Sequence, residues 1–88
     1  MKDTDIYAMA FDKWGFNHQT DMIIEECSEL IHSLMKLKRN RCHKNDVINE
    51  IADVEIMIDQ ARMLFGDKAV SDAKRYKLDR LEKMVTEG

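Results

Sequence analysis

Residues 47–65 read VINEIADVEIMIDQARMLF and form the longest apolar segment with helical spacing in the chain. Its apolar residues recur at the period of an α-helix, which turns about 100° per residue. One stripe is formed by Val47, Ile51, Val54, Ile58, Ala61 and Phe65, with Met57 and Leu64 beside it, and a second strip by Ile48, Ile56 and Met63. A helix that is apolar on most faces is expected to be central, either to a bundle or to a subunit interface.

Two of the acidic residues in this stretch lie in or beside its apolar surface. Glu50 precedes Met57 and Leu64 by one and two heptads, so it falls within the apolar arc, and Asp53 lies at the edge of that arc. A carboxylate costs free energy when it leaves water, unless a partner compensates its charge. The stretch therefore predicts a central helix in which a partner compensates the charges of Glu50 and Asp53.

The remainder of the chain also has a helical composition. It contains no proline, and its glycines are Gly15, Gly66 and Gly88. Good helix formers dominate, and no sustained strand-like alternation is present. The sequence thus predicts an all-α protein.

Caps and glycines divide the chain into four predicted helices. The first covers about residues 3–13, with Asp3 or Thr4 as its cap, and the second runs from residues 17–20 to about residue 39. The third has Asn45 as N-cap, with Asp46 in its first turn, and stops at Phe65 before Gly66. The fourth covers about residues 71–84. Short connections favour antiparallel neighbours, so the expected architecture is a small antiparallel bundle of about four helices.

Length and charge narrow the function classes. The 88 residues form one domain, 1–88, which buries only about 60–65% of the surface of its unfolded chain, so we expect homo-oligomerisation to complete the core. The net charge of −3 argues against polymeric nucleic acid as a partner. No apolar run is long enough to span a membrane, and the N-terminus does not resemble a signal peptide. A cytoplasmic protein with reduced cysteines is expected.

A second acidic stretch, IIEECSELI at residues 23–31, carries Glu25, Glu26 and Glu29. Glu26 and Glu29 lie one helical turn apart, as do Glu50 and Asp53, which places the Cβ atoms of each pair about 5–6 Å apart. If the two helices pack side by side, the four carboxylates converge. Mg²⁺ or Mn²⁺ neutralises such a cluster with the oxygen ligands that it prefers. The alternatives are solvated glutamates, or glutamates paired with Lys and Arg.

The two acidic stretches together resemble a known family. ExxE at Glu26 and Glu29, followed by ExxD at Glu50 and Asp53, resembles the motifs of the MazG-like all-α nucleoside triphosphate pyrophosphatases. The resemblance extends over residues 14–81, including WGFNHQ, SLMKLKRNR and DVEIMIDQ. It implies a Mg²⁺-dependent enzyme, usually a dimer or tetramer, that hydrolyses an NTP or dNTP between the α- and β-phosphates. The products are a nucleoside monophosphate and pyrophosphate.

This resemblance implies roles for individual residues. Glu26, Glu29, Glu50 and Asp53 are the expected metal ligands, and Glu25 is the candidate for orienting the attacking water. Three basic residues are candidates for phosphate contacts: Lys38, within the basic run 36–44, and Lys77 and Arg80 near the C-terminus. Trp14 is the candidate for stacking on the base, although anchoring of the first helix explains it as well.

Three alternatives to this magnesium-dependent enzyme remain open. Cys27, His32, Cys42 and His43 offer zinc ligands without a supporting spacing. Glu29 and His32 form the Glu-x-x-His fragment of di-iron carboxylate bundles, which a homodimer would duplicate. The third alternative is a non-catalytic helical module that dimerises or binds a nucleotide without cleaving it.

Overall fold

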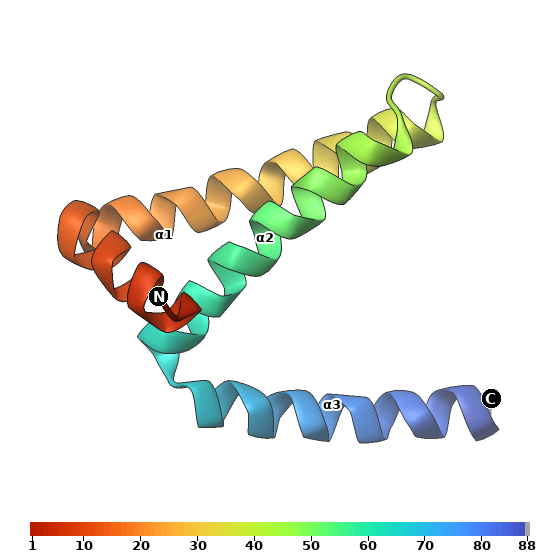
Figure 1. The fold of residues 1–88 in the computed structure, drawn as a ribbon. Helices are drawn as coiled ribbons and strands as arrows, with labels where there is room; N and C mark the ends of the chain where they lie inside the picture. Colours follow the sequence, from red (N-terminus) through yellow and green to blue (C-terminus); the bar gives the residue numbers. More distant parts are fainter. Residues whose placement is uncertain (88) are drawn as a thin grey trace.

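The computed structural model describes residues 1–87, which form three α-helices without strands: α1 (Asp3–Lys38), α2 (Lys44–Phe65) and α3 (Asp67–Glu87). The predicted all-α class is confirmed. The number of helices differs from the expected four, because α1 contains both of the first two predicted segments. Its two limbs meet at a sharp bend at Gly15, where φ is 85° and ψ is 169° (Figure 1).

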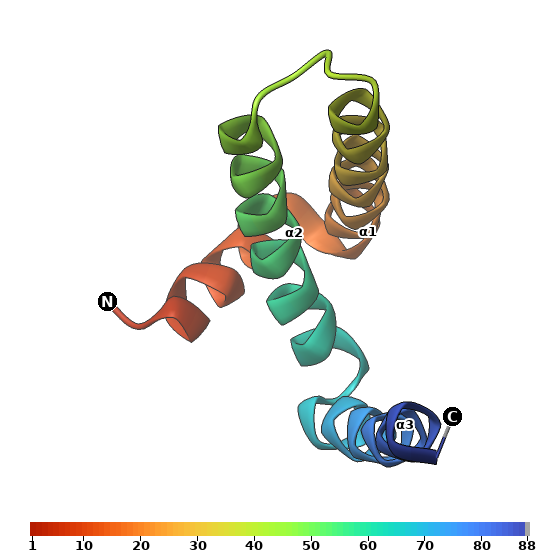
Figure 2. The ribbon, with the colours of Figure 1, turned by 90° about the vertical axis from the view of Figure 1, so that its right-hand side faces the viewer.

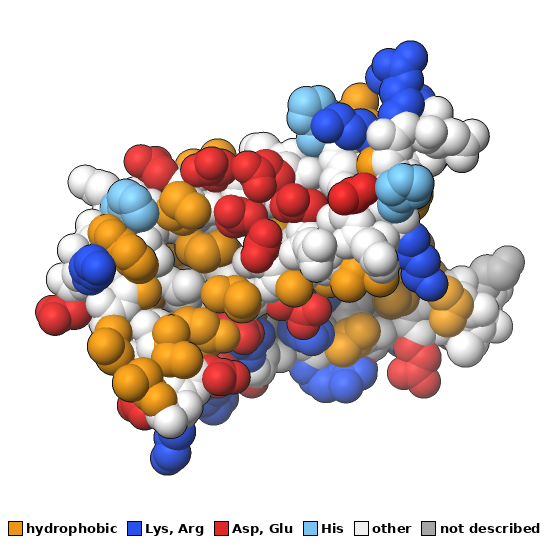
Figure 3. Space-filling view, turned by 45° about the horizontal axis from the view of Figure 1, so that its top comes forward, with side chains coloured by type: hydrophobic (Ala, Val, Ile, Leu, Met, Phe, Trp, Pro, Cys, Tyr) orange, Lys and Arg blue, Asp and Glu red, His pale blue; other side chains and the backbone are white. Residues whose placement is uncertain are grey.

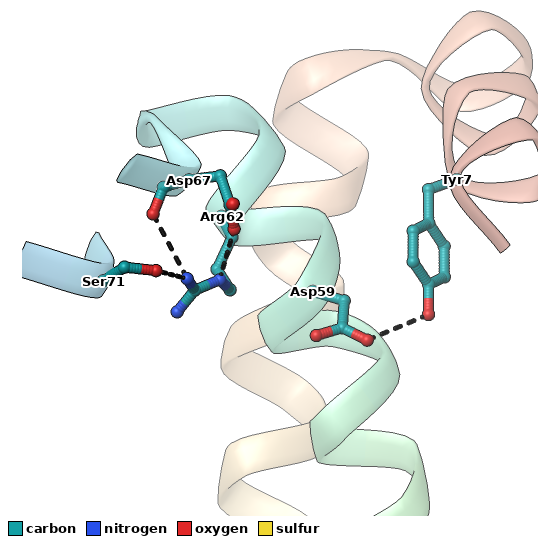
Figure 4. A network of polar contacts seen from close by, with 5 residues as sticks. All are labelled: Tyr7, Asp59, Arg62, Asp67 and Ser71. Atoms are coloured by element: carbon teal, nitrogen blue, oxygen red, sulfur yellow. Dashed lines mark hydrogen bonds and ion pairs between the residues drawn. The ribbon is translucent and has the colours of Figure 1, made fainter. Parts of the chain in front are cut away.

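The bend at Gly15 folds the first limb of α1 back toward the C-terminal half of α2. A side chain is strongly disfavoured at these backbone angles, so glycine suits this position. The two views show the first limb crossing beside α2 rather than continuing the line of the second limb (Figures 1 and 2). The Tyr7 hydroxyl donates a hydrogen bond of 3.1 Å to the Asp59 carboxylate, which ties this limb to α2 (Figure 4).

The second limb of α1 and α2 form an antiparallel hairpin, connected by the loop 39–43. The buried residues of α2 include Val47, from its apolar stripe, and Met57, which lies beside that stripe. A polar pair crosses the same interface: the Gln19 amide donates to the Gln60 amide oxygen at 2.7 Å, and these side chains are only 3% and 4% exposed. The hairpin is the part of the fold that positions the acidic residues.

The helix starts differ from the predicted ones because acidic residues inside the first turn provide the caps. The N-cap of α2 is His43 rather than Asn45, since the His43 N–H donates to the Asp46 carboxylate at 2.8 Å. The N-cap of α1 is Lys2 rather than Asp3 or Thr4, and its N–H donates to the Asp5 carboxylate at 3.1 Å.

The start of α3 lies about four residues before the predicted one. Arg62 Nε donates to the Asp67 carboxylate at 2.6 Å, and the same guanidinium reaches the Ser71 hydroxyl (Figure 4). Asp67 stands in the first turn of α3, where a negative charge is favourable. These contacts fix the junction at Gly66 and recruit residues 67–70 into the helix.

Much apolar surface remains open to solvent in the described chain. Helix α3 contacts only the end of α2, extends away from the hairpin and contains no buried residue (Figure 1). Exposed large apolar side chains occur on all three helices and include Ile24, Ile31, Ile48, Ile51, Phe65, Leu81 and Met84. No large side chain of residues 1–87 is fully buried. Among these residues, no helix combines the length and apolar character needed to cross a membrane.

Candidate metal centre

The candidate metal centre lies where the second limb of α1 faces α2. Glu26 and Glu29 stand one turn apart on α1, and Glu50 projects from α2. One carboxylate oxygen from each of the three residues lies within 4.8 Å of those of the other two. The space-filling view shows acidic side chains gathered over the face where α1 and α2 lie side by side (Figure 3). The hairpin therefore brings together three of the four predicted ligands.

Two oxygens of this cluster lack any partner. Glu26 Oε2 and Glu50 Oε2 are buried, and neither has a hydrogen-bond partner. None of the three ion pairs found within residues 1–87 involves Glu26, Glu29 or Glu50. Within residues 1–87, neighbouring Lys or Arg side chains therefore do not neutralise these three carboxylates, which was one of the alternatives. A buried acceptor without a donor is costly, and a cation would satisfy both oxygens.

The electrostatics of the cluster favour its neutral form. Burial, followed by the negative charges of Glu29, Asp53, Glu50 and Glu25, raises the pKa of Glu26 above its ordinary value of 4.5. Burial, followed chiefly by Glu29 and Asp53, raises the pKa of Glu50 in the same direction. Both shifts share two causes, burial and like charge, and a side-chain hydrogen bond to Glu29 adds to the shift of Glu50. Protonation would therefore neutralise the same oxygens that a divalent cation would neutralise.

Asp53 and Glu25 lie beside the cluster rather than in it. Asp53, the fourth predicted ligand, is exposed and is not one of the three residues whose oxygens converge, although its charge raises the pKa of both Glu26 and Glu50. Glu25 is also exposed and also raises the pKa of Glu26. Both residues are therefore close enough to act on the site through their charge.

A cleft of about 810 Å³ opens from the acidic cluster toward the loop 39–43. Its walls are polar and come from both helices and the loop: Glu29, His32, Ser33, Lys36, Asn40, Arg41, Cys42, His43, Asp46 and Glu50. The α1 residues on this wall are spaced i, i+3, i+4 and i+7 from Glu29, which is the spacing of a single helical face. That spacing is the sequence signal that would have assigned Ser33 and Lys36 to the site.

The predicted phosphate contacts are not brought to the cleft. Lys38 is exposed and does not line it, whereas its neighbour Lys36 does. Lys77 and Arg80 stand on α3, which extends away from the hairpin, so a single chain does not bring them to the acids (Figure 1). The physical reason is that α3 does not fold back over α1, as a closed bundle would require.

Trp14 lies at the bend of α1, away from the acidic cluster. It is 51% exposed, stacks on His18 with ring centroids 5.7 Å apart, and has Lys13 Nζ 5.3 Å from its ring centroid. It lines an apolar groove with Ile6 and Met9 rather than the polar cleft. The predicted stacking on a base is therefore not supported within one chain, and a local role at the bend accounts for its contacts.

The other metal hypotheses find no matching geometry. Cys27 and Cys42 are free thiols, and the Cys42 thiol donates to the Ser33 carbonyl at 3.4 Å. Within residues 1–87, the only group of three or more His, Cys, Asp or Glu side chains close enough to share an ion is Glu26, Glu29 and Glu50. Within one chain, the residues of the alternative zinc set are not close enough to share an ion, and His32 lines the cleft without joining the acidic cluster.

Comparison with known proteins returned no match to any family model, curated protein or solved structure. The resemblance of the two acidic motifs to the MazG-like pyrophosphatases therefore depends on those motifs alone. The geometry of the hairpin shows only that three carboxylates converge, and such oxygen ligands are of the kind that a hard divalent cation prefers.

Proposed function

We propose that this chain is a Mg²⁺-dependent nucleoside triphosphate pyrophosphohydrolase of the MazG-like type. The observation that carries the proposal is the pair of buried, unpartnered oxygens on Glu26 and Glu50, within a cluster that Glu29 completes. These carboxylates would hold Mg²⁺ or Mn²⁺. When bound, the ion supplies charge compensation to the phosphate oxygens and lowers the pKa of water.

The chain's own residues then account for binding and proton transfer. With an ion held by these carboxylates, the triphosphate would lie in the cleft with its α-phosphorus open to attack by water, and pyrophosphate would leave. Glu25 is exposed and adjacent to the cluster, which suits it to orient that water and accept its proton. Asp53 supports the site as an additional outer carboxylate, which a bound ion can recruit.

Homo-oligomerisation is part of the proposal. The open apolar surface of all three helices and the absence of a fully buried large side chain in residues 1–87 both favour association with further copies of this chain. A second copy would complete the four-helix arrangement that one chain leaves open. It is also the means by which Lys77 or Arg80 of one copy could approach a cleft in another.

The test is release of pyrophosphate from a panel of NTPs and dNTPs in the presence of Mg²⁺. We expect turnover of at least one nucleotide, and loss of that turnover in Glu26→Gln, Glu29→Gln, Glu50→Gln and Asp53→Asn, with circular dichroism unchanged. Glu55→Gln is the matched control, because Glu55 is an exposed acid of α2 outside the cluster. Binding of nucleotides without release of pyrophosphate would instead support the non-catalytic module.

A further inference from the structure

The polar cleft combines opposite charges at its two ends. Glu29 and Glu50 line it at the acidic cluster, whereas Lys36 and Arg41 line it near the loop. Glu29 and Lys36 are separated by seven residues on one helical face, which is roughly 10 Å along the helix axis. A ligand that carries both a metal-binding group and additional negative charge would match this distribution.

Only two cationic side chains of the basic run 36–44 line the polar cleft. The run 36–44 contains five Lys and Arg residues, but Lys36 and Arg41 are the only ones that line the cleft. Neither of them belongs to an ion pair within residues 1–87. The Asp46 carboxylate on the same wall already accepts the His43 N–H at 2.8 Å. Both cations are therefore available to an anionic ligand.

The backbone of the loop holds these two residues together. The Arg41 N–H donates to the Lys36 carbonyl at 2.9 Å, and the Asn40 N–H donates to the Leu37 carbonyl at 3.0 Å. With Asn40 in the left-handed region at φ 57°, these bonds form a Schellman motif, which asparagine tolerates better than most residues. The motif places Arg41 beside the helical turn that carries Lys36, so the pair is built into the helix end.

We propose that Lys36 and Arg41 bind the β- and γ-phosphates of the nucleotide, the part that leaves as pyrophosphate. This inference rests on the proposed function and adds the direction of the substrate. The α-phosphate lies at the acidic cluster, the terminal phosphates point toward the loop 39–43, and the nucleoside extends to the opposite side. No phosphate subsite on α3 of the same chain is then required.

The chemical step is balanced in this orientation. The water oxygen forms a bond to the α-phosphorus and loses a proton to a carboxylate of the site. The bond between the α-phosphorus and the bridging oxygen breaks, and its electron pair remains on that oxygen, which leaves with pyrophosphate. Lys36 and Arg41 stabilise the negative charge that this leaving group acquires.

A matched pair of double variants tests the assignment. Lys36→Gln with Arg41→Gln removes the cleft cations, whereas Lys38→Gln with Arg39→Gln removes the same charge from residues of the run that do not line the cleft. The probe is inorganic pyrophosphate with Mg²⁺, measured by isothermal titration calorimetry. We expect the cleft variant to bind at least about tenfold more weakly, because it loses charge-assisted contacts, and the control variant to bind as the wild type does within about twofold.

The results separate this inference from the proposed function. Equal weakening in both double variants, or no binding of pyrophosphate to the wild type, would overturn the subsite even if the wild type hydrolyses nucleotides. Weakening confined to the cleft variant would support the subsite even if no nucleotide in the panel were hydrolysed. Pyrophosphate release by the wild type, with a raised KM in the cleft variant alone, would support both.

Discussion

Replacing Glu26 by glutamine should strengthen the metal-free fold and at the same time remove its response to Mg²⁺. The substitution preserves the shape of the side chain but removes a charge whose oxygen lies within 4.8 Å of an oxygen of Glu29. Two like charges at that separation repel by roughly 1 kcal/mol when water screens them, which is the appropriate limit because Glu29 is exposed. For a domain of this size, about 1 kcal/mol raises Tm by about 4–8 °C.

Mg²⁺ should make the wild type more stable than Glu26→Gln, the reverse of the order expected without metal. A ligand present at about 100 times its Kd stabilises the folded state by about 2.7 kcal/mol, which corresponds to a rise in Tm of about 10–20 °C for the wild type. Glu26→Gln should lose most of this rise, because one of three ligands has lost its charge. Glu55→Gln, the exposed control on α2, should keep it.

The assay is thermal unfolding followed by circular dichroism, with EDTA or with MgCl₂, for the wild type and both variants. The reasoning requires that Glu26→Gln be more stable than the wild type in EDTA and less stable in MgCl₂. A variant that is destabilised in EDTA would show that the Glu26 carboxylate has a favourable partner in the metal-free fold. An undiminished Mg²⁺ response would show that the ion binds elsewhere.

Three further predictions concern stability. First, burial and like charges raise the pKa values of Glu26 and Glu50 in the folded state, so these groups should stabilise the metal-free protein most below about pH 4.5. This contribution should be lost as the pH rises through the raised pKa values. A pH series of Tm in EDTA checks this, and MgCl₂ should flatten the decline. Second, Gly15→Ala should lower the free energy of unfolding by about 1–3 kcal/mol through backbone strain alone, since nothing lies within 4 Å of the added Cβ, and urea unfolding at unchanged m would measure it. Third, Gln60→Leu should lower the free energy of unfolding by about 1–3 kcal/mol, because the buried Gln19 amide loses its acceptor. The double variant with Gln19→Leu should recover most of that stability. A double-mutant cycle without coupling would contradict this.

The sequence predicted the features that depend on local chemistry. Helix-forming composition indicated the all-α class, and Gly15 and Gly66 marked the two sharp junctions, both of which have positive φ. The helical spacing of Glu26 and Glu29, and the position of Glu50 within an apolar arc, indicated that these acids face the partner helix. These inferences succeed because helical periodicity alone determines which side chains share a face.

Features that depend on tertiary contacts were not predictable in the same way. The start of α3 depends on Arg62 reaching Asp67 and Ser71, and the N-cap of α2 depends on Asp46 reaching back to His43. The projection of α3 away from the hairpin keeps Lys77 and Arg80 away from the cleft of the same chain, although the motif resemblance implied phosphate contacts for them. Periodicity shows which face is apolar, but it does not show what covers that face.

We propose above all that one divalent ion binds between α1 and α2 through Glu26, Glu29 and Glu50. The most direct measurement is a crystal structure of the protein grown with MnCl₂, with anomalous difference maps calculated from data collected near the manganese absorption edge. We expect one strong anomalous peak within coordinating distance of oxygens from all three carboxylates. Maps without a peak there, or with the only peak at another group of residues, would contradict it.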